Sequence, residues 1–437
     1  MIKTSLTLAC TLICSMATTG YAADVNVRWE LKTHYRHSAH NRFATQFPFP
    51  SEALPPGETS AFLETVDEGS NVEVSTINIS GKWSIANSLA AHFKIEGIDR
   101  YERNPTSSDH ELDVDHLFLR YGQHFRAMQL PDSPSYYVQL GKFAKFERQN
   151  ARGTESYGLV STAFNRLEDS GIEFGLDFPS GLYTKLSWTT GNPVFIRDPN
   201  ALAGDNGTND RRDPVNTDPS LKSGIVILYD AEIEDFDLTN KPEYGLGLGY
   251  RWNSNDNYSA FDSLLFGYQR KLAEERSLHG TFYGADLDLL DLGEVPGAGG
   301  IKLPIKNNDK SEFGINIWYQ YGDFSLFSQF VKQDLAGLGR LGKEIEFSYI
   351  FNLPFKQFPL KIAPVLRYSS LTHDFEGHPA YPAPSVWWDW EKIDYGINID
   401  INDNIRLTFE FADNRFIRAN RTESNNETLV TLRWRYQ

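Results

Sequence analysis

The sequence predicts an all-β protein, a closed antiparallel transmembrane β-barrel, and three features of the chain lead to this prediction. Segments in which every second residue is apolar recur along most of the chain, and this pattern is typical of β-strands with one apolar face. The connections between these segments alternate between short turns and long polar loops. After residue 22, no segment approaches the roughly eighteen apolar residues of a membrane-spanning helix. Strands rather than helices are therefore expected to cross the bilayer.

The first residues have the pattern of a signal peptide. Lys3 precedes an apolar run from Leu6 to Met16, and small residues flank Tyr21. The run is too short to span a bilayer, and its pattern predicts cleavage after Ala22. We therefore expect a signal peptide at residues 1–22, one barrel domain at residues 23–437, and export to the cell outer membrane of a Gram-negative cell.

Cysteine usage and charge exclude several classes of function. Cys10 and Cys14 both lie in the expected signal peptide, so the rest of the chain has no disulfide, thiol nucleophile or cysteine-bound metal. Removing residues 1–22 takes away Lys3 and leaves 41 basic against 58 acidic residues, a net charge of −17. Nucleic acid is not expected as a partner, because such acidity repels phosphate backbones.

Alternation is clearest in the second half of the chain. Apolar residues at every second position, with Gly, polar or ionised residues at the positions between them except Trp318 and Ile350, occur in the segments Tyr244–Trp252, Phe313–Tyr321, Ile345–Phe351, Ile393–Ile401 and Ile405–Phe411. In a barrel filled with water, the apolar face is expected to meet lipid and the other face to line the lumen. The same pattern recurs earlier, for example over Ile172–Phe178.

The connections set the expected number of strands. Short links occur at Ala86–Ser88, Pro179–Gly181, Gly322–Asp323 and Asn402–Asn404. Long segments rich in Gly, Pro, Asn and Asp occur at Ser38–Gly69, Arg148–Glu168, Asp198–Ser220, Asp291–Asp309 and Asp374–Trp388. With both termini on the periplasmic, short-turn side, nine loops and eight turns predict about eighteen strands, with sixteen as the alternative.

Four places are irregular. The outward face of Leu112–Tyr121 is ambiguous, Leu221–Glu234 is apolar on both faces, and Phe261–Tyr268 is a weak strand. Pro364 lies inside an otherwise regular strand and cannot donate to a ladder, so we expect a bulge or the barrel rim there.

The last strand places Val430, Leu432, Trp434 and Tyr436 on one face, and here the chain resembles the outer-membrane porin families. Their assembly machinery recognises an alternating terminal strand that ends in an aromatic residue, although here Gln437 follows. The stretch Tyr137–Glu147 (YVQLGKFAKFE) is similar to a strand of the phosphate-selective porins, and the long aromatic barrel more loosely resembles the alginate-export barrels. The resemblance implies a barrel in lipid and lipopolysaccharide, passive transport and a homotrimer, but we do not carry over a phosphate preference.

Basic residues on the predicted lumen face are the first candidates for pore-lining residues, because lumen charges set the local potential. They are Lys94, Lys185, Arg251, Lys361, Arg367, Arg406, Arg433 and Arg435. They either bias the lumen toward anions or are ordinary lumen charges balanced by acids. The candidate balancing acids are Glu96, Glu173, Asp177, Glu346 and Glu410.

The third of the predicted outer loops, Arg148–Glu168, is the second candidate. It contains Arg148, Arg152, Arg166 and Glu155. If it folds inward, as the third loop of many porins does, acids and arginines on opposite walls would create a transverse field at a constriction. The alternative is an exposed loop with solvated charges.

Aromatic residues point to a different solute. Trp318 faces the predicted lumen, and Trp387, Trp388 and Trp390 cluster near the mouth of a late strand. Rings along a channel suit the faces of sugars, but an aromatic girdle at the membrane interface explains the cluster better.

Metal and catalytic motifs are weak. His34, His37 and His40 do not share a face in a strand, and Asp286, Asp288 and Asp291 lack the glycine and closing glutamate of a calcium loop. The chain has no Gly-x-Ser-x-Gly, His-Glu-x-x-His or phosphate-binding Gly-Lys-Ser/Thr motif. No catalytic residue, metal or cofactor is expected.

We therefore predict a non-enzymatic outer-membrane porin that allows passive diffusion of small hydrophilic solutes or ions through a water-filled barrel. Within the barrel class, the alternative is a substrate-selective oligosaccharide or alginate-type polysaccharide barrel. The alternative from another class is a secreted, soluble all-β carbohydrate-active protein. In such a protein the apolar faces of the strands would have to pack against each other in a core.

Overall fold

The computed structural model describes residues 24–38, 42–45, 61–64, 69–98, 112–126, 128–149, 152–164, 168–191, 227–230, 242–256, 258–271, 278–282, 285–288, 307–354, 359–375, 389–418 and 421–436. The expected signal peptide lies outside these residues, as do Arg166, Trp387, Trp388, His40 and Asp291. Within them, no helix is long and apolar enough to cross a membrane.

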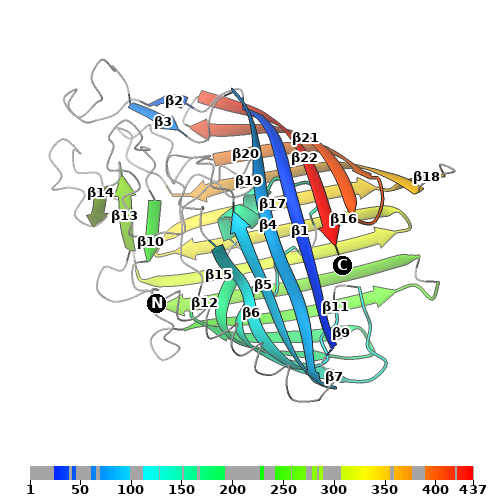
Figure 1. The fold of residues 1–437 in the computed structure, drawn as a ribbon. Coiled ribbons are helices and arrows are strands. Elements are labelled where there is room, and N and C mark those ends of the chain that lie inside the picture. The colour runs from blue at the N-terminus through cyan, green and yellow to red at the C-terminus, as the bar shows by residue number, and fades with distance from the viewer. Residues whose placement is uncertain are drawn as a thin grey trace.

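Sixteen strands close into one antiparallel ring (Figure 1). In order around the ring these are β1 (Asp24–Ser38), β4 (Gly69–Ala86), β5 (Leu89–Ile98), β6 (Leu112–Gly122), β7 (Ser135–Ala144), β8 (Glu168–Asp177), β9 (Leu182–Thr189), β11 (Glu243–Asn253), β12 (Ser259–Lys271), β15 (Asp309–Tyr321), β16 (Phe324–Leu335), β17 (Leu338–Tyr349) with its continuation β18 (Phe351–Pro354), β19 (Pro359–Asp374), β20 (Asp389–Asp400), β21 (Ile405–Arg418) and β22 (Arg421–Tyr436). β22 pairs with β1, for example Thr33 with Leu432, and this pairing closes the ring. Closure leaves no open sheet edge, so ladder groups pair around the wall.

The ring has sixteen strands, the alternative count, because some strand-like segments lie outside the wall. β10 (Ile227–Asp230), β13 (Leu278–Phe282) and β14 (Ala285–Asp288) form a small separate sheet, and β2 (Arg42–Thr45) pairs with β3 (Ala61–Glu64). These strands have four or five residues, fewer than the roughly nine to eleven that a tilted membrane strand needs. They lie beyond one end of the barrel, on the left of Figure 1. The described part of the predicted strand Leu221–Glu234, β10, therefore belongs to this sheet and not to the wall.

Connections of unequal length distinguish the two ends of the barrel. The links after β4, β8, β15 and β20 are short and lie at one end, as predicted. At the other end, residues 39–68, 190–242 and 272–308 separate consecutive wall strands, whereas only Ala336-Gly337 and residues 419–420 separate two other pairs. We call the two ends the short-turn end and the long-loop end.

The outer wall is apolar, as the alternation predicts. In β11, Leu246 and Leu248 are 49% and 55% exposed, whereas Gly245 and Gly247, which face inward, are buried. In β22, Leu432 and Trp434 are exposed on the same outer surface. Such a wall suits a hydrocarbon environment, because each outward side chain meets lipid while the backbone is satisfied within the ring. A soluble two-sheet protein is not the architecture observed.

Two irregular strands have local explanations. Lys94 pairs with His116 but Ile95 pairs with Val114, so Asp115 forms a bulge in β6. This bulge changes the phase of alternation and explains the ambiguous face of Leu112–Tyr121. Pro364 is not at a bulge, because the register of β19 with β17 is the same as its register with β18. Pro364 instead lies opposite the break between β17 and β18, near the short-turn end, where the missing N–H of proline is tolerated.

The weak strand β12 is apolar on its inner face because a core lies inside the barrel. Leu264, Phe266 and Tyr268 point inward and belong to a buried cluster. The other members of the cluster are Leu159, Val160, Phe164, Tyr183, Val331, Leu371 and Trp390. Trp390 therefore faces inward and is not part of an outer aromatic girdle.

Candidate functional site: the third loop and the lumen

The third outer loop, which we call L3 and of which the structure describes residues 145–149 and 152–164, folds into the barrel. It leaves β7 and first contacts the far wall at Glu147, whose main-chain oxygen accepts hydrogen bonds from Asn316 and from Gln329 Nε2 at 3.3 Å. Tyr268 donates a hydrogen bond to the Glu147 side chain. L3 is therefore an inward loop, and the exposed-loop alternative does not hold.

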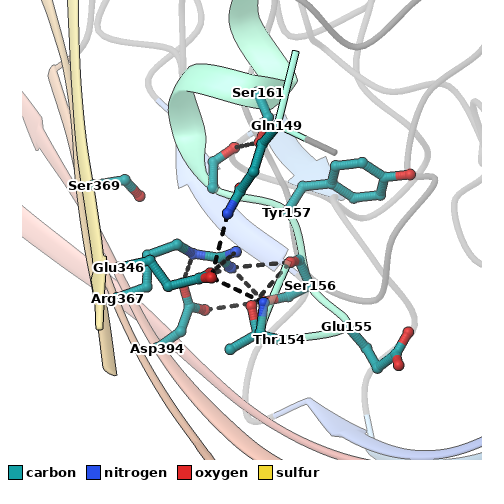
Figure 2. Close-up of polar contacts among 12 residues, drawn as sticks. Gln149, Thr154, Glu155, Ser156, Tyr157, Ser161, Glu346, Arg367, Ser369 and Asp394 are labelled. Atoms are coloured by element: carbon teal, nitrogen blue, oxygen red, sulfur yellow. Dashed lines mark hydrogen bonds and ion pairs between the residues drawn. The ribbon is translucent and has the colours of Figure 1, made fainter. Parts of the chain in front are cut away.

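A buried polar anchor fixes the middle of L3 to β17, β19, β20 and β21 (Figure 2). Arg367, which is completely buried, donates from Nη2 to the main-chain oxygen and to Oγ of Ser156, each at 2.9 Å, and from Nε to Asp394 at 2.8 Å. Ser156 also donates to Asp394 at 3.1 Å and hydrogen-bonds to Glu410. The guanidinium therefore connects two wall strands and the loop, which is the geometry that a rigid planar donor favours.

Loop amides bind the carboxylates of the same wall. The N–H groups of Gly153 and Glu155 donate to Glu346 and Glu410, both at 2.9 Å. Gln149 Nε2 donates to Glu346 at 3.2 Å. Acids on the β17–β21 wall are thus covered by L3 and are not free lumen charges.

An apolar helix completes the docking of L3. The helix α2 (Leu159–Phe164) packs on β16, β17, β19 and β20, and Leu159 and Val160 are fully buried in the internal cluster. Its first turn begins at Gly158, where a Cβ would lie 1.9 Å from Oε2 of Glu344. Only glycine allows the loop to approach the wall this closely without moving that carboxylate.

Glu155 extends the contact to β22 and β1, the next strands around the ring after β21. Its carboxylate is 2.7 Å from Lys32 Nζ on β1 and 3.8 Å from Arg433 on β22. Burial opposes ionisation of Glu155, but Lys32 and Arg433 outweigh it, and the pKa lies well below its usual range. Glu30 joins the cluster at 2.6 Å from Arg435 and 3.8 Å from Arg433.

Most of the predicted pore-lining cations are neutralised. Lys94 pairs with Glu96 and Asp115, and Arg251 pairs with Asp177 and Asp262. Arg406 pairs with Asp400, and Arg367 pairs with Glu346. Arg433 pairs with Glu155, and Arg435 pairs with Glu30. These six cations are therefore lumen charges balanced by acids, which is the second of the two alternatives. Lys185 differs, because it makes no ion pair with any residue that the structure describes.

An internal cavity of about 180 Å³, which we call the L3 chamber, lies between the start of L3 and β6–β9, β11, β12 and β15. Its floor is the connection between β6 and β7, which folds inward so that the Met128 N–H donates to Asp262 at 3.3 Å. The basic residues that line the chamber are Arg120, Arg126, Lys145, Arg148, Lys185 and Arg251, with His116 and His124 beside them. The acids are Glu173 and Asp262, and the aromatic residues are Phe118, Phe125, Phe143, Phe146, Tyr183 and Trp318. Trp318, on β15, thus lines this cavity.

A larger cavity of about 1320 Å³, which we call the vestibule, opens at the short-turn end. It shares Arg120, His124 and Arg126 with the chamber, so the two cavities adjoin. Lys82 and His92 also line the vestibule, and no carboxylate does among the residues that line it. Burial, followed by the nearby cations, holds the pKa of His124 well below its usual range, so this ring adds no charge at neutral pH.

The predicted loop residues do not converge on one site. Arg148 pairs with Glu168 and lines the chamber, and Arg152 stacks on Tyr157 with its Cζ 3.5 Å from the ring centroid. Glu155 contacts β1 and β22, which adjoin the wall on which L3 is docked. The charges are nevertheless segregated, with acids under L3 on one wall and excess cations across the chamber on the other.

Sequence reasoning missed Arg120, Arg126 and Lys145 as lining residues. Arg120 belongs to the strand whose face was ambiguous, and Arg126 lies in a connection with no strand periodicity. Lys145 leaves the lumen wall with L3 and pairs with Glu243 at 2.8 Å. The length of the β6–β7 connection could have indicated in the sequence that it contributes to the lumen, because the other described connections at the short-turn end are shorter.

No group of three or more candidate metal ligands occurs in the part of the chain that the structure describes. His34 faces inward and is 2.5 Å from Oγ1 of Thr431, whereas His37 contacts Ser70 on the outside. As predicted, these two histidines lie on opposite faces.

A closed antiparallel ring with an apolar outer wall and a loop docked inside it defines a transmembrane β-barrel of the outer-membrane type. No family model and no curated protein matches the chain. Its fold is similar to that of OprB from Pseudomonas putida, with a TM-score of 0.55, 8% identity and 94% of each chain covered. An anion-selective porin from Comamonas acidovorans (TM-score 0.49, 10% identity, 95% of this chain and all of that one) and the outer membrane channel DcaP of Acinetobacter baumannii (0.48, 9%, 95% and 97%) are also similar. At these identities the likeness concerns the fold alone, which is that of the outer-membrane porins.

Proposed function

We propose that this protein is a non-enzymatic outer-membrane porin through which small hydrophilic solutes or ions diffuse passively. The observation that carries the proposal is that L3 occupies only part of the lumen, docked on the acidic wall, and leaves adjoining cation-lined cavities on the other side. An excess of charge of one sign along a narrow water-filled path raises the local concentration of the opposite ion. The expected preference is therefore for anions.

Membrane topology follows from the same proposal. The short-turn end and both chain ends would face the periplasm, the long loops would face outward toward lipopolysaccharide, and residues 1–22 would be removed on export. A homotrimer fits this class of barrel but is not needed for the pore, since the ring of each chain closes by itself.

Planar-bilayer recording of refolded residues 23–437 tests the proposal. Stable open steps with a reversal potential shifted toward that of the anion in a salt gradient are expected. Absence of steps from protein that is folded in detergent would overturn the porin proposal. Block by long oligosaccharides or by alginate fragments at low concentration would instead favour a polysaccharide barrel.

A further inference from the structure

We propose that the L3 chamber is a binding site for small organic anions in which a carboxylate is joined to a flat apolar ring. The proposal deepens the porin proposal and rests on it for the route by which such an anion reaches the chamber. It is carried by the chemistry of the lining, in which cations without an ion-pair partner lie next to exposed ring faces.

Three cations of the chamber are already neutralised. Arg251 binds Asp177 and is 3.0 Å from Asp262, and Lys145 and Arg148 bind Glu243 and Glu168. These three do not require an anion from solution.

Three other cations have no carboxylate within ion-pair distance among the described residues. Arg120 donates only to the neutral side-chain oxygen of Gln139, at 2.7 and 3.1 Å. The side chains of Lys185 and Arg126 make no hydrogen bond to any residue that the structure describes. These cations come from β6, β9 and the β6–β7 connection, so they approach the chamber from different sides.

The two acids in the lining do not cancel this excess. Asp262 is bound by Arg251 and accepts a hydrogen bond from Tyr183 at 2.6 Å. Glu173 accepts one from Tyr137, which leaves it charged, so it acts on Lys185 and Arg120 and offsets one of the three cations that lack an ion pair. The chamber therefore keeps an excess of positive charge, and the group that complements it is an anion.

The apolar part of the lining selects among anions. Phe146 on L3 stacks on Tyr268 at 5.0 Å, and Trp318 packs on Phe327 at 4.5 Å, so both rings are held in place. Lys185 Nζ is 5.8 Å from the Phe146 ring centroid, which places a cation and an apolar face on the same side of the cavity. A cavity of about 180 Å³ is large enough for a six-membered ring with one carboxylate. An inorganic anion would leave these rings in contact with water.

Benzoate is the probe, measured by calorimetry on the folded protein in detergent and by current block in planar bilayers. We expect saturable binding of benzoate, weaker binding of acetate, which lacks the ring, and weaker binding of benzyl alcohol, which lacks the charge. Lys185→Met keeps the apolar stem and removes the charge, and is expected to weaken benzoate binding by about tenfold or more, as for the loss of a charge-assisted hydrogen bond. Since Lys185 makes no ion pair in the described chain, the variant should fold normally.

Lys361→Met is the matched control, because Lys361 lies on the inner face of β19 and does not line the chamber. It should leave benzoate binding unchanged. Equal binding of benzoate and acetate, or equal effects of the two lysine variants, would overturn the inference even if the protein conducts. Binding of benzoate by a protein that shows no open steps would support the inference and refute the porin proposal.

Discussion

Replacing Arg367 with Met should release L3 from the wall while leaving the closed ring in place. The guanidinium makes two hydrogen bonds to Ser156, each at 2.9 Å, inside a fully buried site. Hydrogen bonds to charged groups contribute about 1.5–3 kcal/mol each, so the loss for the docked loop is about 4 kcal/mol. At 1.4 kcal/mol per factor of ten, the ratio of docked to undocked loop falls by about a thousandfold.

Hydrogen exchange of the loop amides measures this ratio, because Gly153, Glu155 and Leu159 donate to wall side chains only when L3 is docked. Arg367→Met should lower the protection of these amides by about the same thousandfold factor and make single-channel currents noisier. Protection in the β20 and β21 ladders should fall much less.

Two further variants separate loop docking from general damage. Ser156→Ala keeps Arg367 beside its acids and removes only the loop hydroxyl, so it should lower protection in the same amides by a smaller factor. Arg406→Met removes a lumen arginine that binds Asp400 away from L3 and should leave these amides unchanged. If Arg367→Met folds and its loop amides remain as protected as in the wild type, the anchor does not hold L3.

Three other perturbations test separate parts of the structure. Burial raises the pKa of Glu147 in L3 from 4.5, its value in the unfolded chain, to about 7. The stability that the protonated carboxyl contributes to the folded state is therefore fully present below pH 4.5 and is lost as the pH rises through 7. The free energy of thermal unfolding should accordingly decrease over this range, with a contribution from Glu147 on the order of 3 kcal/mol. Glu147→Gln should remove this contribution and make the decrease smaller; an unchanged pH profile would contradict the assignment. Gly158→Ala should push the Glu344 carboxylate aside and destabilise docked α2 by about 1–3 kcal/mol, seen as faster exchange in α2, and wild-type exchange would show that the approach is not tight. Leu248→Arg places a charge on the lipid face in the middle of β11 and should cost about 2–4 kcal/mol in vesicles, whereas Lys185→Arg on the lumen face should not; equal folding yields would contradict the assignment of the faces.

The barrel and the facing of its regular strands could be predicted from the sequence, because period-two alternation is a local property. Tyr244–Trp252 and Ile393–Ile401 have the outward faces that the pattern indicates. Strand number was less certain for a physical reason: β10 and β13 have strand-like sequences, and only their length and their pairing with each other show that they lie outside the wall.

The site was predictable only in part. The third loop was recognised by its order among the predicted outer loops, and its inward course was one of two alternatives. Its anchors were not predictable, because Ser156 meets Asp394 and Glu410 across 238 and 254 residues of sequence. The internal core was also not predictable, because it depends on contacts between segments far apart in the sequence. Leu264 and Phe266 are apolar residues on the inner face of β12, and they fit the barrel pattern only once α2 is known to cover them.

Reactivity of a single cysteine in the chamber tests the central claim, that the solute path passes the cations facing L3. Residues 23–437 contain no cysteine, so Lys185→Cys and its lipid-facing neighbour Leu186→Cys provide a matched pair on β9. A sulfonate-bearing methanethiosulfonate reagent, which is small and anionic, should modify Lys185→Cys during planar-bilayer recording and lower the single-channel current, and should leave the current of Leu186→Cys unchanged. Full modification of Lys185→Cys without any change in current would show that ions take another route and would contradict a solute path through the chamber.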